Sequence, residues 1–211
     1  MKIELTLAEQ MRFNNLHFDE YIMQMKDYAK EYNVPIIQDE GLSFLLTLIR
    51  VKNPLRILEI GTAIGYSSAM MALNSNATID TIERDLKMEE EAIKNIKQLG
   101  IENKVNLIFK DALEAFDLVS HNKYDLIFID AAKAQYTNFF NLYKPLLKDD
   151  GIIVSDNMLF HGVKLEEAKS RSLRGLIRKL EAYQSFLLNH EEFASTIFNI
   201  GDGIAVSTKK R

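Results

Sequence analysis

Acidic and amide side chains stand at the ends of short apolar segments of the chain, where they are able to bind hydroxyl groups or a cation. They are Glu59, Glu83, Asp111, Asp130, Asp156 and Asn157. In an open parallel α/β sheet, ligands bind beyond the carboxyl ends of the strands. If the apolar segments are strands of such a sheet, we expect these side chains to meet at one edge of it.

The turn after the first apolar segment contains Gly61 and Gly65, which permit close approach of a ligand to the backbone. Its G-x-x-x-G spacing differs from the G-x-G-x-x-G of dinucleotide-binding folds. Glu59 would repel a pyrophosphate but attract a cationic ligand, and Ser67, at the next helix start, would hydrogen-bond a ligand carboxylate. A turn of this kind, taken alone, is more often only a turn.

Residues further along the chain complete a nucleoside pattern. Glu83 ends the second segment, where an acid commonly holds ribose hydroxyls, and Asp111 and Ala112 follow the third, where an adenine is expected. An adenosine with a positive centre and an amino-acid tail fits this set, which predicts S-adenosylmethionine. The predicted cofactor contacts are Ile36, Glu59, Gly61, Thr62, Tyr66, Ser67, Glu83, Asp111, Ala112 and Asp130.

A second group of residues has the composition of a metal site. Asp130, Asp156 and Asn157 supply oxygen ligands from two strand ends, which suits Mg²⁺ or another hard divalent cation. Lys133 follows Asp130 by one turn, and it would act as a general base or orient the substrate oxygen. The alternatives are ordinary turn residues and a surface lysine.

The elements that must position these residues alternate along the chain. Near-continuous apolar runs favour parallel strands covered on both faces, and helical patterns lie between them. A Gly-Asp-Gly turn at 201–203 predicts a terminal antiparallel pair. We therefore expect a doubly wound α/β fold in a single domain over 1–211, with a helical cap at 1–52 and a Rossmann-like core at 53–211. The predicted strands are residues 56–60, 78–83, 105–109, 124–130, 151–155, 196–200 and 204–208, and the predicted helices are 16–32, 41–51, 67–73, 86–99 and 135–147.

Composition excludes several classes of protein. The 211 residues are 47% hydrophobic and 27% charged, with a formal net charge of −4, so a uniformly basic nucleic-acid-binding protein is excluded. The chain has no Cys, which excludes disulfides, thiolate metal sites and Cys nucleophiles. We find no apolar run of membrane-spanning length and no signal-peptide pattern, which predicts a cytoplasmic protein without a membrane partner.

Four stretches carry a family resemblance: ILEIGTAIGYSS, IDTIERD, YDLIFIDAAKAQYTNFF and DDGIIVSDNMLFHGV. Over about residues 30–210 the chain resembles class I S-adenosylmethionine-dependent O-methyltransferases, and more narrowly the metal-dependent catechol and caffeoyl-CoA O-methyltransferases. The resemblance implies a seven-stranded Rossmann-like sheet with an antiparallel last strand. It also implies Asp130, Asp156 and Asn157 as metal ligands, Lys133 as the catalytic lysine, and a homodimer.

A narrower resemblance concerns the substrate. The short chain is similar to bacterial tRNA 5-hydroxyuridine methyltransferases, which implies formation of 5-methoxyuridine at the wobble position of the tRNA anticodon. The 5-hydroxyl and 4-carbonyl of this base are vicinal, like the oxygens of a catechol, so either substrate would chelate Mg²⁺. A basic helix face adds candidate phosphate contacts at Lys164, Arg171, Arg174 and Arg178, although most such faces are simply solvated.

Three alternatives remain open from the sequence. The first is an O-methyltransferase that acts on small catechol-like molecules. The second is a nicotinamide-dependent oxidoreductase, against which Glu59 and the absent G-x-G-x-x-G argue. The third is a binding protein that keeps the fold without catalysis.

Overall fold

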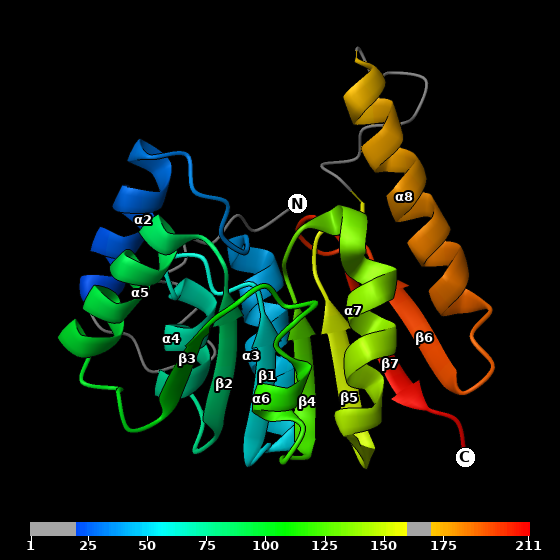
Figure 1. Ribbon diagram of the computed structural model, residues 1–211, viewed down its shortest axis with the longest axis horizontal. Helices are drawn as coiled ribbons and strands as arrows, with labels where there is room; N and C mark the ends of the chain where they lie inside the picture. The colour runs from blue at the N-terminus through cyan, green and yellow to red at the C-terminus, as the bar shows by residue number, and fades with distance from the viewer. Residues whose placement is uncertain (1–19, 160–169) are drawn as a thin grey trace, which may run out of the picture.

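A seven-stranded sheet forms the centre of the computed structural model, which describes residues 20–159 and 170–211 (Figure 1). The strand order is β3-β2-β1-β4-β5-β7-β6. The strands are β1 (Arg56–Ile60), β2 (Thr78–Glu83), β3 (Val105–Phe109), β4 (Tyr124–Ile129), β5 (Leu147–Ser155), β6 (Phe193–Phe198) and β7 (Ile204–Lys209).

The strand directions agree with the predicted topology. Strands β1 to β5 pair in parallel, whereas β7 runs antiparallel to both β5 and β6. The β6–β7 connection contains Gly201 at φ +55° and Gly203 at φ +87°, so the hairpin turn uses glycine conformations that other residues rarely adopt. The Rossmann-like doubly wound sheet with an antiparallel last strand is confirmed.

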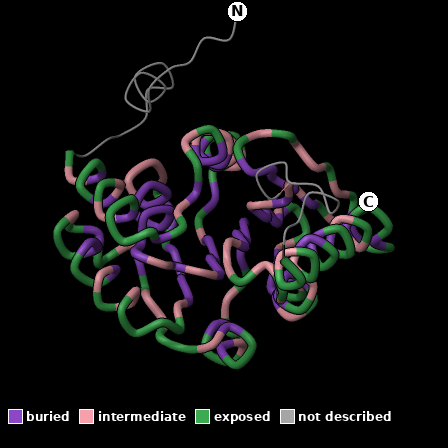
Figure 2. Tube along the Cα trace, turned by 90° about the horizontal axis from the view of Figure 1, so that it is seen from above, coloured by how far each residue is buried: buried purple, intermediate pink, exposed green. Residues whose placement is uncertain are grey.

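Helices cover both faces of the sheet, which explains why its central strands are apolar throughout (Figure 2). One face packs against α3 (Asp39–Lys52), α4 (Tyr66–Leu73) and α5 (Leu86–Gln98), with α2 (Tyr21–Glu31) joining the same core. The other packs against α6 (Phe116–Val119), α7 (Tyr136–Tyr143) and α8 (Arg171–Leu188). Two short 3-10 turns, η1 (Lys133–Gln135) and η2 (Lys144–Leu146), flank α7.

The N-terminal helices reach the carboxyl edge of the sheet through their connection. Leu42, Leu45 and Ile49 of α3 lie in the core on one face of the sheet, while Val34 and Pro35, between α2 and α3, line the cavity at its carboxyl edge. The amphipathic pattern of α3 is therefore satisfied against the sheet face, and the loop between α2 and α3 contributes to the wall of the cavity.

Some element boundaries differ from the predicted ones. Strand β5 begins at Leu147, earlier than the predicted 151, because Leu147 is buried and pairs with Tyr124 across a β-bulge. Strand β6 begins at Phe193, whose ring packs against Phe140 and His190. No helix among the described residues is long and apolar enough to span a bilayer.

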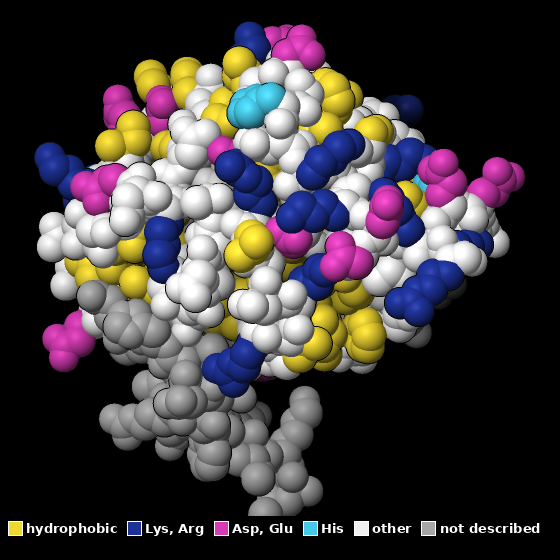
Figure 3. All heavy atoms as spheres, turned by 90° about the horizontal axis from the view of Figure 1, so that it is seen from below, with side chains coloured by type: hydrophobic (Ala, Val, Ile, Leu, Met, Phe, Trp, Pro, Cys, Tyr) yellow, Lys and Arg dark blue, Asp and Glu magenta, His cyan; other side chains and the backbone are white. Residues whose placement is uncertain are grey.

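Charges of both signs intermingle on the opposite side of the molecule, at the amino ends of the parallel strands (Figure 3). Many of them are paired, as in Lys52–Asp150 at 2.7 Å and Lys148–Asp125 at 2.9 Å. An exposed pair such as Lys52–Asp150 contributes little stability, whereas Asp125 of the second pair is buried.

Candidate active site

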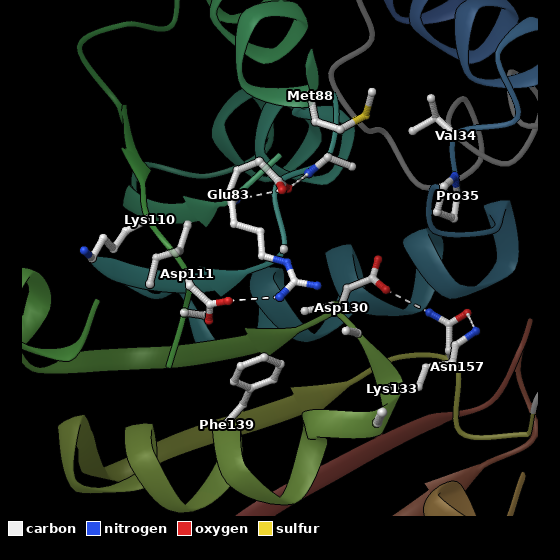
Figure 4. A pocket seen from close by; sticks show the side chains of 18 of the residues that line it. Val34, Pro35, Glu83, Met88, Lys110, Asp111, Asp130, Lys133, Phe139 and Asn157 are labelled. Atoms are coloured by element: carbon white, nitrogen blue, oxygen red, sulfur yellow. Dashed lines mark hydrogen bonds and ion pairs between the residues drawn. The ribbon is translucent and has the colours of Figure 1, made fainter. Parts of the chain in front are cut away.

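A cavity of about 530 Å³ opens at the carboxyl edge of the sheet, on the side where β1 to β5 end (Figure 4). Its size is typical of a small-molecule binding pocket. Residues that follow each of the five parallel strands line it, among them Gly61, Glu83, Asp111, Asp130 and Asn157. The side chains at the strand ends therefore lie together at one edge of the sheet, as the sequence predicted.

The turn after β1 brings two strand ends together at Gly61. This residue has φ +100°, and a Cβ added there would lie 2.2 Å from the backbone oxygen of Asp130. The neighbouring Ala63 is also left-handed, at φ 46°, and its backbone N–H donates to Oε2 of Glu83 at 2.8 Å. The turn thus places its backbone directly beside the cavity. At position 61 only glycine fits, because it has no side chain.

Glu83 and Asp111 are held by backbone amides at one end of the cavity. Oε1 of Glu83 accepts from the backbone N–H groups of Arg84 and Asp85, both at 2.8 Å. Asp111 accepts from the N–H of Leu113 and pairs with Arg84 at 2.9 Å, and these contacts lower the pKa of its carboxyl. Both acids are therefore presented as fixed acceptors, as recognition of hydroxyl or amino groups requires.

Glu59 lies beneath the cavity and does not line it. Its side chain is fully buried and accepts hydrogen bonds from the hydroxyls of Ser67, Ser68 and Thr81. Burial raises the pKa of the Glu59 carboxyl from its ordinary 4.5 to about 7, although the three hydroxyls oppose this shift. In this conformation Glu59 ties the start of α4 to β1 and β2.

The predicted cofactor contacts therefore divide into two groups. Gly61, Glu83, Asp111, Ala112 and Asp130 line the cavity. Ile36, Glu59, Thr62, Tyr66 and Ser67 are not among the residues that line it. Thr62 bonds to Thr81 at 2.6 Å, and Tyr66 is 1% exposed. The tight turn draws Thr62, Tyr66 and Ser67 into the core, because the left-handed residues Gly61, Ala63 and Gly65 reverse the chain around them. Ile36, between α2 and α3, packs partly buried against the core on the same face of the sheet.

The titration of Glu59 gives a testable pH dependence. Because the pKa of Glu59 is higher in the folded than in the unfolded protein, the free energy of unfolding falls as the pH rises from about 4.5 to 7. Glu59→Gln does not titrate, so its stability relative to wild type should rise by about 3 kcal/mol across this range. Urea denaturation at pH 4.5 and 7.5 measures the difference. The control is Glu90→Gln, at an exposed position. The expectation would be contradicted if the stability difference between Glu59→Gln and wild type were the same at both pH values.

The side chains of Asp130, Asp156, Asn157 and Lys133 form one cluster at the ends of β4 and β5. Figure 4 shows three of them, Asp130, Lys133 and Asn157. Nδ2 of Asn157 donates to Oδ1 of Asp130 at 2.8 Å and to Oδ2 of Asp156 at 3.2 Å. Nζ of Lys133 donates to Oδ1 of Asn157 at 3.0 Å. Neighbouring strand ends and the left-handed Asn157, at φ 60°, bring these groups together.

Two neighbouring carboxylates, the half-buried Asp130 and the buried Asp156, make this cluster unfavourable as an anion. Burial and then the charge of Asp156 raise the pKa of Asp130 well above its usual range. Burial likewise raises the pKa of Asp156, which is 2% exposed, to about 6. A cation between the carboxylates would relieve this cost.

The donor set fits a hard divalent cation. Among the described residues no three acidic or histidine side chains form a metal-binding group, so the candidate ligands are two carboxylates and one amide. Their oxygens match the preference of Mg²⁺, with water or substrate completing the coordination. The Asn157 amide must present its oxygen rather than its nitrogen to such an ion.

Several residues of the cavity were not predicted from sequence. Val34, Pro35, Ala63, Met88 and Phe139 form apolar walls, and Leu176 approaches from α8. Arg84 and Lys110 add cations near Asp111. Phe139 is 4% exposed, so it belongs to the core and forms part of the cavity wall at the same time.

The predicted basic face is partly described. Arg171, Arg174 and Arg178 are exposed on α8, whose Leu176 lines the cavity, while Lys164 lies outside the described residues. Figure 1 shows the N-terminal half of α8 standing beyond the carboxyl edge of the sheet. The three arginines therefore belong to a helix that borders this edge, and Arg174 and Arg178, two positions from Leu176, lie on the helix face turned away from the cavity.

The strand order and the chemistry of these strand ends define a Rossmann-like methyltransferase fold. The O-methyltransferase family model matches residues 17–210, and the chain belongs to this family. It is 30% identical to the flavonoid 3′,5′-methyltransferase of Vitis vinifera over 197 residues, which cover 89% of this chain and 83% of that protein.

Solved structures agree with this assignment. A "putative caffeoyl-CoA O-methyltransferase" from Staphylococcus aureus superposes with a TM-score of 0.89 and 38% identity over 97% of each chain. An O-methyltransferase from Bacillus cereus in complex with SAH superposes with a TM-score of 0.79 and 22% identity over 92% of each chain. The second similarity shows the shared fold.

Proposed function

We propose that this protein transfers a methyl group from S-adenosylmethionine to an oxygen of its substrate, with the help of a divalent cation. The observation that carries the proposal is that one cavity is lined by the nucleoside-type acceptors Glu83 and Asp111 and by Asp130, Lys133 and Asn157. Membership of the O-methyltransferase family supports the reaction class, and the SAH complex of the Bacillus cereus protein supports the cofactor.

The cavity residues supply the parts that such a transfer requires. Glu83 would hold the ribose hydroxyls and Asp111 the adenine amino group, which fixes the sulfonium relative to the cluster. A divalent cation on Asp130, Asp156 and Asn157 would polarise the substrate oxygen. Lys133, whose Nζ lies 3.0 Å from Asn157 Oδ1, would accept or orient the proton of that oxygen.

Ligand-induced stabilisation tests the cofactor. At 100 times its dissociation constant, S-adenosylmethionine should stabilise the fold by about 2.7 kcal/mol, which raises Tm by about 5–11 °C. Glu83→Gln should weaken binding about 10–100-fold, because a charged acceptor is lost. Thermal denaturation and calorimetry measure both, with the exposed Glu102→Gln as control. Stabilisation by NAD and not by S-adenosylmethionine would contradict the proposal.

We propose wobble 5-hydroxyuridine in tRNA as the substrate. The chain's own support is the exposed arginine face of α8, a helix whose Leu176 lines the cavity, because such a face is suited to contact the phosphates of a nucleic acid. The decisive experiment compares modified nucleosides in tRNA from strains with and without the gene. Loss of 5-methoxyuridine with accumulation of 5-hydroxyuridine is expected in the strain without it.

The arginines give a quantitative form of this test. The double variant Arg174→Gln/Arg178→Gln should lower tRNA affinity about tenfold or more and reduce the salt slope by about two, because two phosphate contacts are lost. Its affinity for S-adenosylmethionine should stay unchanged. Lys97→Gln on α5 is the matched control. Equal tRNA binding by all three proteins would exclude this face as the RNA contact.

A small catechol-like substrate is the second candidate. The cavity walls at Val34, Pro35, Phe139 and Leu176 are apolar and suit a planar ring, and the Vitis vinifera relative is named for a flavonoid. Methylation of a catechol but not of tRNA from the strain without the gene would favour this candidate.

The homodimer and the cytoplasmic location remain predictions from the sequence. Light scattering measures the oligomeric state.

A further inference from the structure

Tyr136 is a buried polar residue to which neither the sequence nor the proposed reaction gives a role. It is the first residue of α7, three positions after Lys133, and it is 1% exposed. Its hydroxyl has no hydrogen-bond partner, a property that among the described buried side chains it shares with Tyr66 alone. A buried hydroxyl without a partner loses its hydration without compensation, so it requires an explanation.

The hydroxyl of Tyr136 lies next to the carboxylate cluster. Burial and then the charges of Asp130 and Asp156 raise the pKa of Tyr136, whereas the side-chain amide of Asn157, which lies close to the hydroxyl without forming a hydrogen bond of normal geometry, acts to lower it. Its ring packs edge-on against Tyr183, with centroids 5.3 Å apart, and the Tyr183 hydroxyl already bonds to Ser155 at 2.8 Å. The ring of Tyr136 is therefore fixed, and its hydroxyl faces the cluster.

The cluster has an amide that must change its partners when a cation binds. Both hydrogen bonds from Nδ2 of Asn157 go to Asp130 and Asp156. A cation between these carboxylates takes their oxygens and requires the amide oxygen of Asn157 to face it. The Nδ2 group then needs another acceptor, since a buried amide without one costs free energy.

We propose that Tyr136 is a positioning residue whose hydroxyl accepts the Asn157 amide N–H in the cation-bound site and so selects the amide orientation that presents Oδ1 to the cation. The same hydroxyl donates its own proton to a carboxylate oxygen of the cluster. The proposal rests on the cation-assisted reaction above. It explains why a polar group is kept, without a partner, in a position where Phe would pack equally well.

Tyr136→Phe tests this role without measuring turnover. Calorimetry with Mn²⁺ and Mg²⁺, in the presence of S-adenosylhomocysteine, should show affinity lowered about 10–100-fold, as is usual when a group that orients a metal ligand is removed. Without a cation the Tm should stay equal or rise, because the removed hydroxyl had no partner. The affinity for S-adenosylhomocysteine should not change.

Tyr124→Phe is the matched control, because it removes a buried hydroxyl that bonds to Asp80 at 2.8 Å. It should lower the Tm and leave cation affinity at the wild-type value. Wild-type cation affinity in Tyr136→Phe would overturn the role of Tyr136 and leave the proposed reaction intact. Absence of Mn²⁺ and Mg²⁺ binding by the wild-type protein would overturn the cation in the proposed function and the role of Tyr136 with it.

Discussion

Replacing Asp156 by Asn is expected to lower kcat/KM for methyl transfer about 10³-fold. Asp156 is one of two carboxylates in the cluster at the ends of β4 and β5, and it is 2% exposed, so water cannot substitute for its charge. The variant keeps the shape of the side chain but halves the negative charge available to a cation. Loss of about 4 kcal/mol of transition-state stabilisation corresponds to this factor.

The same variant should keep or gain stability in the absence of a cation. The pKa of Asp156 is raised to about 6 by burial, so the ionised form costs stability as the pH rises from 3.8 through 6. A neutral Asn removes that cost at pH 7.5. A normal or higher Tm together with lost activity would separate a defect in the site from misfolding.

The control is Asp150→Asn, at a carboxyl that pairs with Lys52 at 2.7 Å and is 78% exposed. Its activity and its cation dependence should equal those of wild type, since exposed ion pairs contribute little. Methyl transfer by Asp156→Asn within threefold of wild type, or wild-type activity that survives complete chelation, would refute the cation mechanism.

Gly61→Ala is expected to destabilise the protein by about 4 kcal/mol, which lowers the Tm by about 8–16 °C. Two costs add at this position. The residue has φ +100°, which is strained for any other amino acid, and the added Cβ would lie 2.2 Å from the backbone oxygen of Asp130. The obstacle is backbone, so β1 and β4 must move apart, and the cavity between them must change shape.

Gly100→Ala separates the two costs. Gly100 has φ +63°, but a Cβ there would meet nothing within 4 Å, so only the backbone strain remains. We expect a loss of about 1 kcal/mol and a decrease in Tm of about 2–4 °C, with unchanged affinity for S-adenosylmethionine. Equal Tm values for the two variants would contradict the argument from the close approach at Gly61.

The sequence was sufficient to predict the convergence of the strand ends. Glu83, Asp111, Asp130 and Asn157 line one cavity because parallel strands place their carboxyl ends on one edge, whatever the details of packing. The apolar strands and the Gly-Asp-Gly turn likewise predicted the order and direction of the elements. These features depend on local pattern, which is visible residue by residue.

Whether a side chain faces the cavity or the core could not be predicted in this way. Glu59 looks like a ligand for a cation in the sequence, yet its carboxylate is fully buried among the hydroxyls of Ser67, Ser68 and Thr81. These partners come from α4 and β2, and two of them stand in the first turn of α4, directly after the glycine turn. The direction of Glu59 therefore depends on how the turn folds back on the sheet.

By itself, then, the sequence determined the sheet and the set of acids at its edge, because these follow from periodicity and residue type, and its family resemblance indicated the class of chemistry. Only the tertiary structure decided which acids line the cavity, that Leu176 of α8 and Val34 enclose it, and that Tyr136 faces the carboxylates. Such contacts join residues distant in the chain, and packing at close density selects one arrangement of side chains that no local pattern encodes.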